Sequence, residues 1–516
     1  SVIEMSLDFQ LVKVVGQLKE LERYPLYEPF AYASIVQDES TGDIMYVLEE
    51  IELDSVERQV YEELRRIVML ELPPPEELSK VGDVKNYLLN ELKRIVGRYR
   101  KLFRNVSPSS FAKFLYYMDR DLLGYGPIDA LMRDENIEDI SCDGVGRPVY
   151  VFHRRYESIP TNIVPMTDKG LDDLVVKLIH MSGRHVSVAT PIVDAQLPDG
   201  SRIAVTYRRE VSPGGSTFTI RRFRKNPLTF TELVKFGNIS AEIAGYFWTM
   251  LDNGRSFLVL GVTGAGKTSF LNAMATFIRP HMKIITVEEV PEINLPHKNW
   301  VRLVTRQSYG SEKINEITLF DLVKATLRMR PDYLIVGEIR GEEAYVLFQA
   351  VNTGHSGMST MHAESFEAAV NRLMSPPMNI PPAYIPAMSI FVMIKRVKIG
   401  GRLTRRVTEV GEVYMDDSGK IRFNTVFKWN PRNDTHESYV SNSVLVRQIS
   451  DMTGKDVDEV LMEIGTRSKI VSWMVENGIF NFEDVSTYVQ TYYTNPDKVL
   501  NQVTGKVGEI EATTQV

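Results

Sequence analysis

The chain has 516 residues, too many for a single hydrophobic core, and this length indicates about two to four domains. Its hydrophobic fraction of 43% and charged fraction of 25% are those of an ordinary globular protein, and its net charge of −7 argues against a nucleic-acid coat and against a polybasic membrane anchor. The one cysteine, Cys142, excludes an intramolecular disulfide, argues against a cysteine-rich zinc site and indicates a reducing compartment.

Neither a membrane span nor a signal peptide is indicated. The most apolar stretch, residues 383–394, is short and is interrupted by Pro386. Residues 1–21 lack the basic start and the continuous apolar run of a signal peptide. We therefore expect a cytoplasmic protein without a transmembrane segment of its own, which reaches the cytoplasmic face of a membrane only through a partner.

The first part of the chain is predicted to contain a variable segment and an α+β domain. Residues 1–75 mix short helical and strand-like pieces, and the α+β domain follows over residues 76–225. Apolar positions at helical spacing predict a helix over residues 82–100. Further on, turns rich in glycine predict pairs of strands over residues 140–155 and 194–210.

The second part has a different pattern. After a hinge predicted over residues 226–237, strands and helices alternate from about 255 to 360. This alternation indicates an α/β domain over residues 238–430, with a parallel sheet covered by helices on both faces. Residues 431–516 are mostly helical in pattern and are predicted to form a separate C-terminal extension.

A phosphate-binding motif, GxxxxGK[ST], follows the predicted strand at residues 257–260 and opens a predicted helix. Backbone N–H groups of such a loop cradle phosphates, and the start of the helix adds a favourable dipole. We expect Lys267 to reach the β- and γ-phosphates and the Thr268 hydroxyl to ligate Mg²⁺. The predicted nucleotide-binding residues of the loop are Gly261, Thr263, Gly264, Ala265, Gly266, Lys267, Thr268 and Ser269.

Glutamates follow two later predicted strands. Glu338 comes after the strand in RPDYLIVGEIRG, and Glu288, Glu289 and Glu292 come after the strand in ITVEEVPEI. The carboxyl ends of strands in a doubly wound sheet face the ligand crevice, so either group can serve the metal or the attacking water. For each glutamate taken alone, a solvated acidic turn is the favoured interpretation, and it is the phosphate-binding loop that shifts the balance to a functional role.

Two histidines, His355 and His362, lie in a hydroxyl-rich stretch of small residues. They could form a metal pair, but neither cysteine nor closely spaced acidic residues support zinc. A sensor of the γ-phosphate fits better, because an imidazole N–H can donate to a phosphate oxygen and move on hydrolysis.

Arginines are dense before the predicted hinge, at Arg202 and at Arg221, Arg222 and Arg224. A solvated strand face or a nucleic-acid patch is the simpler interpretation. The alternative hypothesis is that this domain offers guanidinium groups to a triphosphate held by the other domain, of the same or a neighbouring subunit.

Four stretches in chain order resemble the nucleotide-site boxes of the type II/type IV secretion ATPase superfamily: GVTGAGKT, ITVEEVPEI, LRMRPDYLIVGEIRGEEA and NTGHSGMSTMHA. Residues 124–144 and the stretch LPDGSRIAV resemble the N-terminal domain of that family, so the resemblance covers residues from about 120 to 400. Within the superfamily, the chain is most similar to the archaeal branch and to the motor ATPase of the archaellum, the rotary swimming filament of archaea.

This resemblance implies an α/β fold class, with a RecA-like P-loop NTPase domain preceded by an α+β N-terminal domain. It implies a homo-hexameric ring in which ATP and Mg²⁺ bind between the two domains and hydrolysis moves one domain against the other. Such a ring acts at the cytoplasmic face on a polytopic membrane platform protein, together with accessory cytoplasmic motor proteins. The implied output is archaellum assembly or rotation, with type IV pilus assembly or type II-like secretion as alternatives.

The resemblance also assigns roles to residues. Glu292 corresponds to the catalytic glutamate that polarises water, and Glu338 to the Walker B carboxylate. Two departures from the family pattern stand out: the acidic box reads Glu-Glu-Val-Pro over residues 288–291, and Gly337 stands where many P-loop enzymes have a metal-linked aspartate. Glu338 is therefore expected to reach Mg²⁺ through water. The remaining assignments are the His box, at His355 and His362, and the N-terminal-domain arginines, at Arg202 and Arg221 with Arg222 and Arg224 as near substitutes.

Two other classes of function are compatible with such a RecA-like domain. A nucleic-acid motor predicts a basic channel and stimulation by DNA or RNA, and the acidic net charge argues against it. A non-catalytic, nucleotide-gated scaffold predicts binding without turnover. The intact set of Lys267, Thr268, Glu292 and Glu338 argues against that scaffold.

Overall fold

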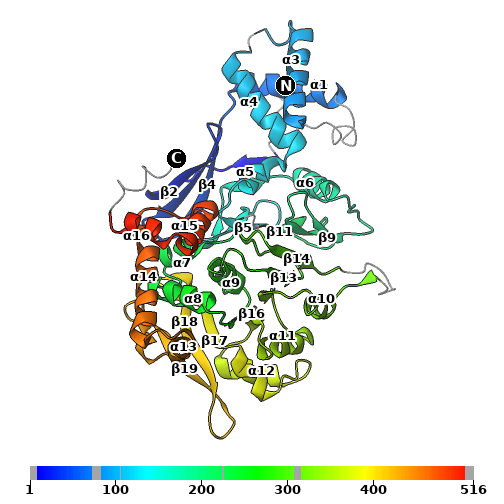
Figure 1. Ribbon diagram of the computed structural model, residues 1–516. Coiled ribbons are helices and arrows are strands. Elements are labelled where there is room, and N and C mark those ends of the chain that lie inside the picture. Colours follow the sequence, from blue (N-terminus) through cyan, green and yellow to red (C-terminus); the bar gives the residue numbers. More distant parts are fainter. Residues whose placement is uncertain (1–7, 72–82, 105, 224–225, 307–314, 506–516) are drawn as a thin grey trace. The chain divides into compact units, whose positions relative to one another are not determined.

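The chain divides into two units, Ser1–Arg224 and Lys225–Val516. The computed structural model describes residues 8–71, 83–104, 106–223, 226–306 and 315–505, and Figure 1 shows them as a ribbon. Each unit has hydrophobic cores of its own, and each is described below by itself.

The N-terminal unit begins with a three-stranded antiparallel sheet in the order β2-β3-β4. The strands are β2 (Leu18–Tyr27), β3 (Ala31–Asp38) and β4 (Ile44–Glu50), and a short strand β1 (Phe9–Leu11) pairs with β8 (Ile163–Pro165). Ala33 and Tyr46 of this sheet are fully buried in the same core as Val151 and Ile220 of the following sheet. The sequence separates residues 1–75 from the α+β domain, but strands β2 to β4 share that domain's core.

Three helices form a smaller core of their own within this unit (Figure 1). They are α1 (Ser55–Glu71), α3 (Val84–Arg98) and α4 (Pro108–Met118), and shorter helical turns follow at Asp119–Leu123, Gly126–Ile128 and α5 (Asp129–Met132). The helix predicted over residues 82–100 is confirmed as α3, whose first turn is capped by the side chain of Asp83.

A six-stranded antiparallel sheet in the order β7-β6-β5-β11-β10-β9 forms the rest of the unit. Its strands are β5 (Ile137–Cys142), β6 (Tyr150–His153), β7 (Glu157–Pro160), β9 (Ile192–Gln196), β10 (Arg202–Thr206) and β11 (Thr217–Arg221). Both predicted strand pairs are confirmed, as β5 with β6 and as β9 with β10. Helix α6 (Asp168–Met181) contributes Leu171 and Val175 to the core of this sheet.

The C-terminal unit is built on a nine-stranded sheet in the order β14-β13-β15-β16-β12-β17-β18-β19-β20. The first six strands in this order, from β14 to β17, run parallel to one another, and β18, β19 and β20 extend the sheet, each antiparallel to the strand before it. The strands are β12 (Phe257–Gly261), β13 (Ile284–Glu288), β14 (Trp300–Val304), β15 (Tyr333–Val336), β16 (Ser356–His362), β17 (Ile390–Ile399), β18 (Arg402–Met415), β19 (Ile421–Asn430) and β20 (Thr435–Ser438).

Helices cover both faces of this sheet, so the predicted α/β architecture is confirmed. Phe257 and Val259 of β12 face one core, and Leu258 and Leu260 face the other. The first core contains residues of α7 (Phe230–Lys235), α8 (Ala241–Asp252) and α9 (Lys267–Ala275); the second contains residues of α10 (Leu319–Thr326), α11 (Glu343–Asn352) and α12 (Phe366–Met374).

Part of the predicted hinge is helical. Residues 230–235 form α7, and its Phe230 and Leu233 are buried in the first core of the C-terminal unit. Thr229 caps this helix in a capping box with Glu232. The apolar positions of this short stretch therefore belong to the core of the C-terminal unit, which the composition of the sequence alone did not reveal.

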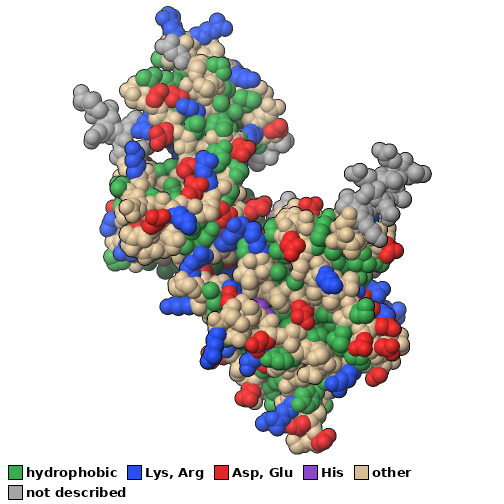
Figure 2. All heavy atoms as spheres, turned by 90° about the vertical axis from the view of Figure 1, so that its left-hand side faces the viewer, with side chains coloured by type: hydrophobic (Ala, Val, Ile, Leu, Met, Phe, Trp, Pro, Cys, Tyr) green, Lys and Arg blue, Asp and Glu red, His purple; other side chains and the backbone are tan. Residues whose placement is uncertain are grey.

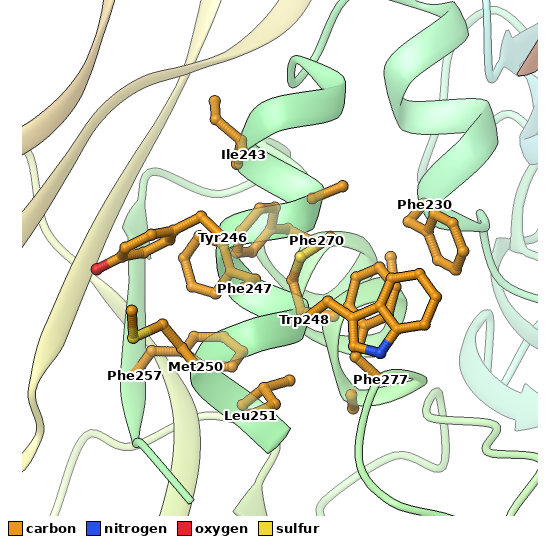
Figure 3. Close-up of a cluster of buried hydrophobic side chains, with 14 of the residues drawn as sticks. Phe230, Ile243, Tyr246, Phe247, Trp248, Met250, Leu251, Phe257, Phe270 and Phe277 are labelled. Atoms are coloured by element: carbon orange, nitrogen blue, oxygen red, sulfur yellow. The ribbon is translucent and has the colours of Figure 1, made fainter. Parts of the chain in front are cut away.

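The C-terminal helices are also part of that core rather than a separate extension. They are α13 (Val444–Thr453), α14 (Val457–Glu476), α15 (Phe482–Thr494) and α16 (Pro496–Val503). Trp248 of α8 stacks on Phe277 with ring centroids 4.9 Å apart, and Tyr492 of α15 meets the same indole edge-on at 5.1 Å. Figure 3 shows Trp248 and Phe277 in this aromatic cluster. Arg467 of α14 donates to Asp252 Oδ2 at 2.6 Å, so an ion pair also joins α14 to the end of α8.

The surface carries charges of both signs, interspersed on the face that Figure 2 shows. In the described ranges, no helix combines the length with the apolar content that crossing a bilayer requires.

Candidate nucleotide-binding site

The phosphate-binding loop lies at the carboxyl end of β12, which is flanked on both sides by parallel strands, β16 and β17. Gly264 and Gly266 adopt φ values of +80° and +92°, in the left-handed region that glycine populates readily. A Cβ on Gly261 would lie 2.7 Å from the carbonyl oxygen of Ile394, so a close backbone approach requires glycine there too. Strand packing and loop geometry together therefore explain the three glycines of the motif.

Lys267 begins α9, and its side chain folds back across the loop. Its Nζ donates to the carbonyl oxygen of Gly261 at 3.0 Å. Burial lowers the pKa of the Lys267 ammonium, and the negative charge of Glu338 acts in the opposite direction. Thr268 and Ser269 are half-buried in the first turn of the same helix, whereas Thr263 and Gly264 are exposed at the loop tip. The ammonium and the start of the helix are thus placed at one end of the loop, as phosphate binding requires.

The predicted glutamates follow two strands that pair directly, β13 and β15. Glu292 and Glu338 are both half-buried just beyond the strand ends. Glu289, in contrast, pairs with Arg340 at the surface, and both of those side chains are about half exposed. The structure therefore brings Glu292 and Glu338 to the carboxyl edge of the parallel sheet, as the sequence predicts.

Glu288 is the one glutamate of the acidic box that is buried. Its side chain is 3% exposed, and burial raises the pKa of its carboxyl to about 7 in spite of two hydrogen bonds from backbone N–H groups. A Cβ on Gly337 would lie 3.2 Å from Cγ of Glu288. The Glu288 side chain thus occupies space beside residue 337, and a side chain at 337 would require the glutamate to shift by a few tenths of an ångström.

The two histidines lie at opposite ends of β16. His362 is the β-sheet partner of Gly261, so it lies beside the first residue of the phosphate-binding loop. His355 precedes the strand and donates its backbone N–H to the carbonyl of Ala350. A strand of this length separates the two histidines by about 20 Å. The structure therefore brings His362, but not His355, to the phosphate-binding loop of the same chain.

The predicted arginines belong to the N-terminal unit. Arg202 and Arg221 are direct partners in β10 and β11, and both are exposed. Arg222 donates from Nη1 to the carbonyl oxygens of Leu131 and Asp134, at 3.1 and 2.8 Å, and burial lowers its pKa. Those bonds give Arg222 a structural role within its own unit. Arg224 lies outside the described residues.

One further arginine lies beside the loop. A Cβ on Gly266 would lie 3.2 Å from Cδ of Arg405, which belongs to β18. Strand β17 separates β18 from β12, and its residue Arg396 pairs with Arg405. The run KRVKIGGRLTRR, with basic residues on both sides of a Gly-Gly pair, is the sequence signal for this basic hairpin. Without the strand order, that signal could not connect Arg405 with the loop.

This arrangement defines the class of protein. A glycine-rich loop between a central parallel strand and a helix, followed by a lysine and by glutamates on neighbouring strands, makes the C-terminal unit a P-loop nucleoside triphosphatase domain. The family model described as "Type II/IV secretion system protein" matches residues 125–472, and the chain belongs to this family. The family consists of ATPases, and the chain is an ATP hydrolase. The resemblance to this superfamily is thereby confirmed.

Similar proteins extend the match to nearly the whole chain. Uncharacterized protein MJ0900 of Methanocaldococcus jannaschii is 35% identical over 508 residues, which cover 94% of this chain and 91% of that protein. Uncharacterized protein MJ1287 of the same organism is 43% identical over 243 residues, which cover 47% of this chain and 89% of that protein. The solved structure of the Legionella pneumophila ATPase DotB is 15% identical with a TM-score of 0.41, over 72% of this chain and 95% of DotB.

Proposed function

We propose that the chain is a Mg²⁺-dependent motor ATPase that couples ATP hydrolysis at the carboxyl edge of β12 to domain movement. The observation that carries this proposal is the position of Lys267, whose ammonium bridges the loop by donating to the Gly261 carbonyl at 3.0 Å. A triphosphate offers stronger, charge-assisted acceptors than that carbonyl, so the ammonium is suited to transfer to it.

The residues at the loop fit a nucleotide with its metal ion. Gly264 and Gly266 hold the left-handed turns that direct backbone N–H groups inward, and α9 starts at the end of the loop. Thr268, and Glu338 through water, would hold Mg²⁺ by their oxygen atoms, and the ion would neutralise charge on the phosphates. All these residues belong to one unit of the chain.

The positions of these residues and the family resemblance support the proposed catalytic roles. Glu292 accepts a proton from the attacking water, for which a half-buried carboxylate near the edge of the sheet is suited. His362, beside Gly261, donates to the γ-phosphate and senses its loss. Arg202 and Arg221 offer two guanidinium groups to a nucleotide of their own or of a neighbouring subunit.

We further infer the assembly and the machine. The chain forms a homo-hexamer that works at the cytoplasmic face of a membrane on a polytopic platform protein, with accessory cytoplasmic motor proteins. The order of the four motif boxes and their likeness to the archaellum motor ATPase support archaellum assembly or rotation as the output. The family description also supports the alternative, assembly of an archaeal type IV pilus or a type II-like secretion filament.

A hydrolysis assay tests the first part of this proposal. The purified full chain releases phosphate from ATP with Mg²⁺, EDTA abolishes the release, and Lys267→Ala reduces it to background, because the loop loses its phosphate-directed charge. Lys428→Ala, which removes an exposed lysine of β19, is the matched control and keeps the wild-type rate. Wild-type hydrolysis by Lys267→Ala would refute the proposed site.

Capture from membranes tests the second part. The tagged chain, incubated with membranes of its own organism, is expected to retain a polytopic archaellum platform protein. Retention of a pilus or secretion platform instead would establish the alternative. Stimulation of the ATPase by DNA or RNA, with no platform retained, would contradict both and support a nucleic-acid motor.

A further inference from the structure

Glu288 lies between the two predicted catalytic glutamates and contacts the backbone on both sides. It is the last residue of β13, and its Oε1 accepts hydrogen bonds from the backbone N–H groups of Glu292 and Ile293, each at 2.9 Å. Residues 289–291 thus form a short loop, and the hydrogen bonds to the Glu288 side chain tie the end of this loop back to its start. Glu292, the proposed catalytic base, is held at its own backbone nitrogen.

The other side of Glu288 faces the Walker B turn. Cγ of Glu288 lies 3.2 Å from the place where a Cβ on Gly337 would be. The Gly337 N–H donates to the carbonyl oxygen of Val287 at 2.8 Å, so the two strand ends stay in register at this point. Glu338, the proposed metal-linked carboxylate, is the next residue along the chain.

The charge of Glu288 is balanced only weakly. Its Oε2 lies 4.0 Å from Nε of Arg302, too far for a hydrogen bond, and this oxygen accepts no hydrogen bond from the part of the chain that the structure describes. Burying a carboxyl group in this way is costly, and a neutral turn-forming residue would avoid the cost. A carboxylate nevertheless holds the two N–H groups more firmly than a neutral acceptor, because charge-assisted hydrogen bonds are about twice as strong.

We propose that Glu288 is a positioning residue for ATP hydrolysis, whose carboxylate fixes the backbone at Glu292 and whose Cγ braces the turn at Gly337. It thereby sets the place of the Glu292 carboxylate relative to Glu338 without touching the nucleotide itself. The inference rests on the proposed function, in which Glu292 is the base. Because a small misplacement of a catalytic group slows chemistry more than it weakens binding, the effect falls on kcat.

A double-mutant cycle on the full chain tests this role. Glu288→Gln keeps an oxygen acceptor of the same length but removes the charge, and at pH 8.5, above the raised pKa of about 7 of the Glu288 carboxyl, we expect kcat to fall about tenfold. The KM for ATP and the affinity for a fluorescent ADP analogue are expected to stay within about twofold of wild type, because the phosphate-binding loop is untouched. Glu367→Gln, at an exposed position of α12, is the control and keeps the wild-type kcat.

The decisive comparison is made in a Glu292→Gln background. If Glu288 acts through Glu292, adding Glu288→Gln to Glu292→Gln does not slow hydrolysis further, because positioning an absent base has no effect. If the two reductions in hydrolysis rate multiply in the double variant, or if Glu288→Gln keeps the wild-type kcat, the inference is wrong. Wild-type hydrolysis by Glu292→Gln alone would instead refute the proposed base, so the two failures are distinguishable.

Gly337→Ala tests the same contact from the opposite side and remains available if Glu288→Gln fails to fold. The added methyl group meets Cγ of Glu288 at 3.2 Å, so the glutamate must shift. A fall in kcat with unchanged ADP affinity is expected. An unchanged kcat in a folded Gly337→Ala variant would contradict the bracing role.

Discussion

Arg202 and Arg221 face each other directly across the β10–β11 pair, and both side chains are exposed on the same face of the sheet. Ile203 and Ile220, the next residues of the two strands, are buried on the other face. Like charges placed directly opposite each other destabilise a sheet by a few tenths of a kcal/mol to about 1 kcal/mol. Asp139 of β5 is the direct partner of Arg221 on the other side of β11, and its negative charge offsets part of this repulsion.

Replacing Arg202 should therefore change the free energy of unfolding and the ATP turnover in different ways. We expect Arg202→Gln to leave the free energy of unfolding unchanged or to raise it by about 0.5 kcal/mol, since the repulsion is relieved. The same change should lower ATP turnover at least about tenfold, because arginines directed at a transferring phosphoryl group make large contributions. Urea unfolding and phosphate release measure the two effects. Arg147→Gln, an exposed arginine elsewhere in the unit, is the control; equal turnover in the two variants would argue against an arginine finger.

Arg405 provides a prediction within the C-terminal unit. Its Cδ lies next to Gly266, so its guanidinium group is near the phosphate-binding loop. We expect Arg405→Ala to weaken ADP binding about tenfold, the effect of losing one charge-assisted hydrogen bond. Fluorescence titration with an ADP analogue measures the change, and Arg422→Ala, whose arginine pairs with Asp416 at the surface, serves as the control. Equal affinities in the two variants would exclude a phosphate contact by Arg405.

The packing of the C-terminal helices gives a stability prediction. Ile470 of α14 is fully buried in the core that contains α8, whereas Met462 of the same helix is 70% exposed. Ile470→Ala is expected to lower the free energy of unfolding of the C-terminal unit by about 2–5 kcal/mol, and Met462→Ala by about 0.5 kcal/mol or less. Denaturant unfolding followed by tryptophan fluorescence compares the two. Similar small effects would show that α14 does not stabilise the unit.

These outcomes show which features local sequence can predict. The phosphate-binding loop follows from residues 261–268 alone, because glycine conformations, a lysine and a helix start are local properties. His362 lies beside the phosphate-binding loop and His355 lies far from it because of the strand register, which cannot be read from spacing along the chain. The roles of Arg405 and Arg222 depend on which distant segments meet them, and helical periodicity in α14 could not say that α8 is its partner.

The raised pKa of Glu288 predicts a pH dependence of stability. Its carboxyl keeps a proton up to about pH 7 in the folded chain, mainly because of burial, whereas in the unfolded chain it loses that proton near its ordinary value of 4.5. Between these values the folded state binds more protons, so the free energy of unfolding falls as pH rises through this window, by about 1–3 kcal/mol from this group.

Urea unfolding at pH 5 and pH 7.5 measures this contribution. Glu288→Gln, which cannot titrate, should lack it, and the difference between the variant and the wild type should change with pH. The same pH dependence in both proteins would show that Glu288 titrates near its ordinary pKa.

The most direct test of the account is single-turnover hydrolysis of ATP by Glu292→Gln alongside the wild type, with nucleotide binding measured on the same samples. The account predicts that the variant binds ATP with the wild-type affinity and hydrolyses it at least about tenfold more slowly, because it lacks the carboxylate that accepts the proton of the attacking water. Hydrolysis by Glu292→Gln at the wild-type rate would contradict it.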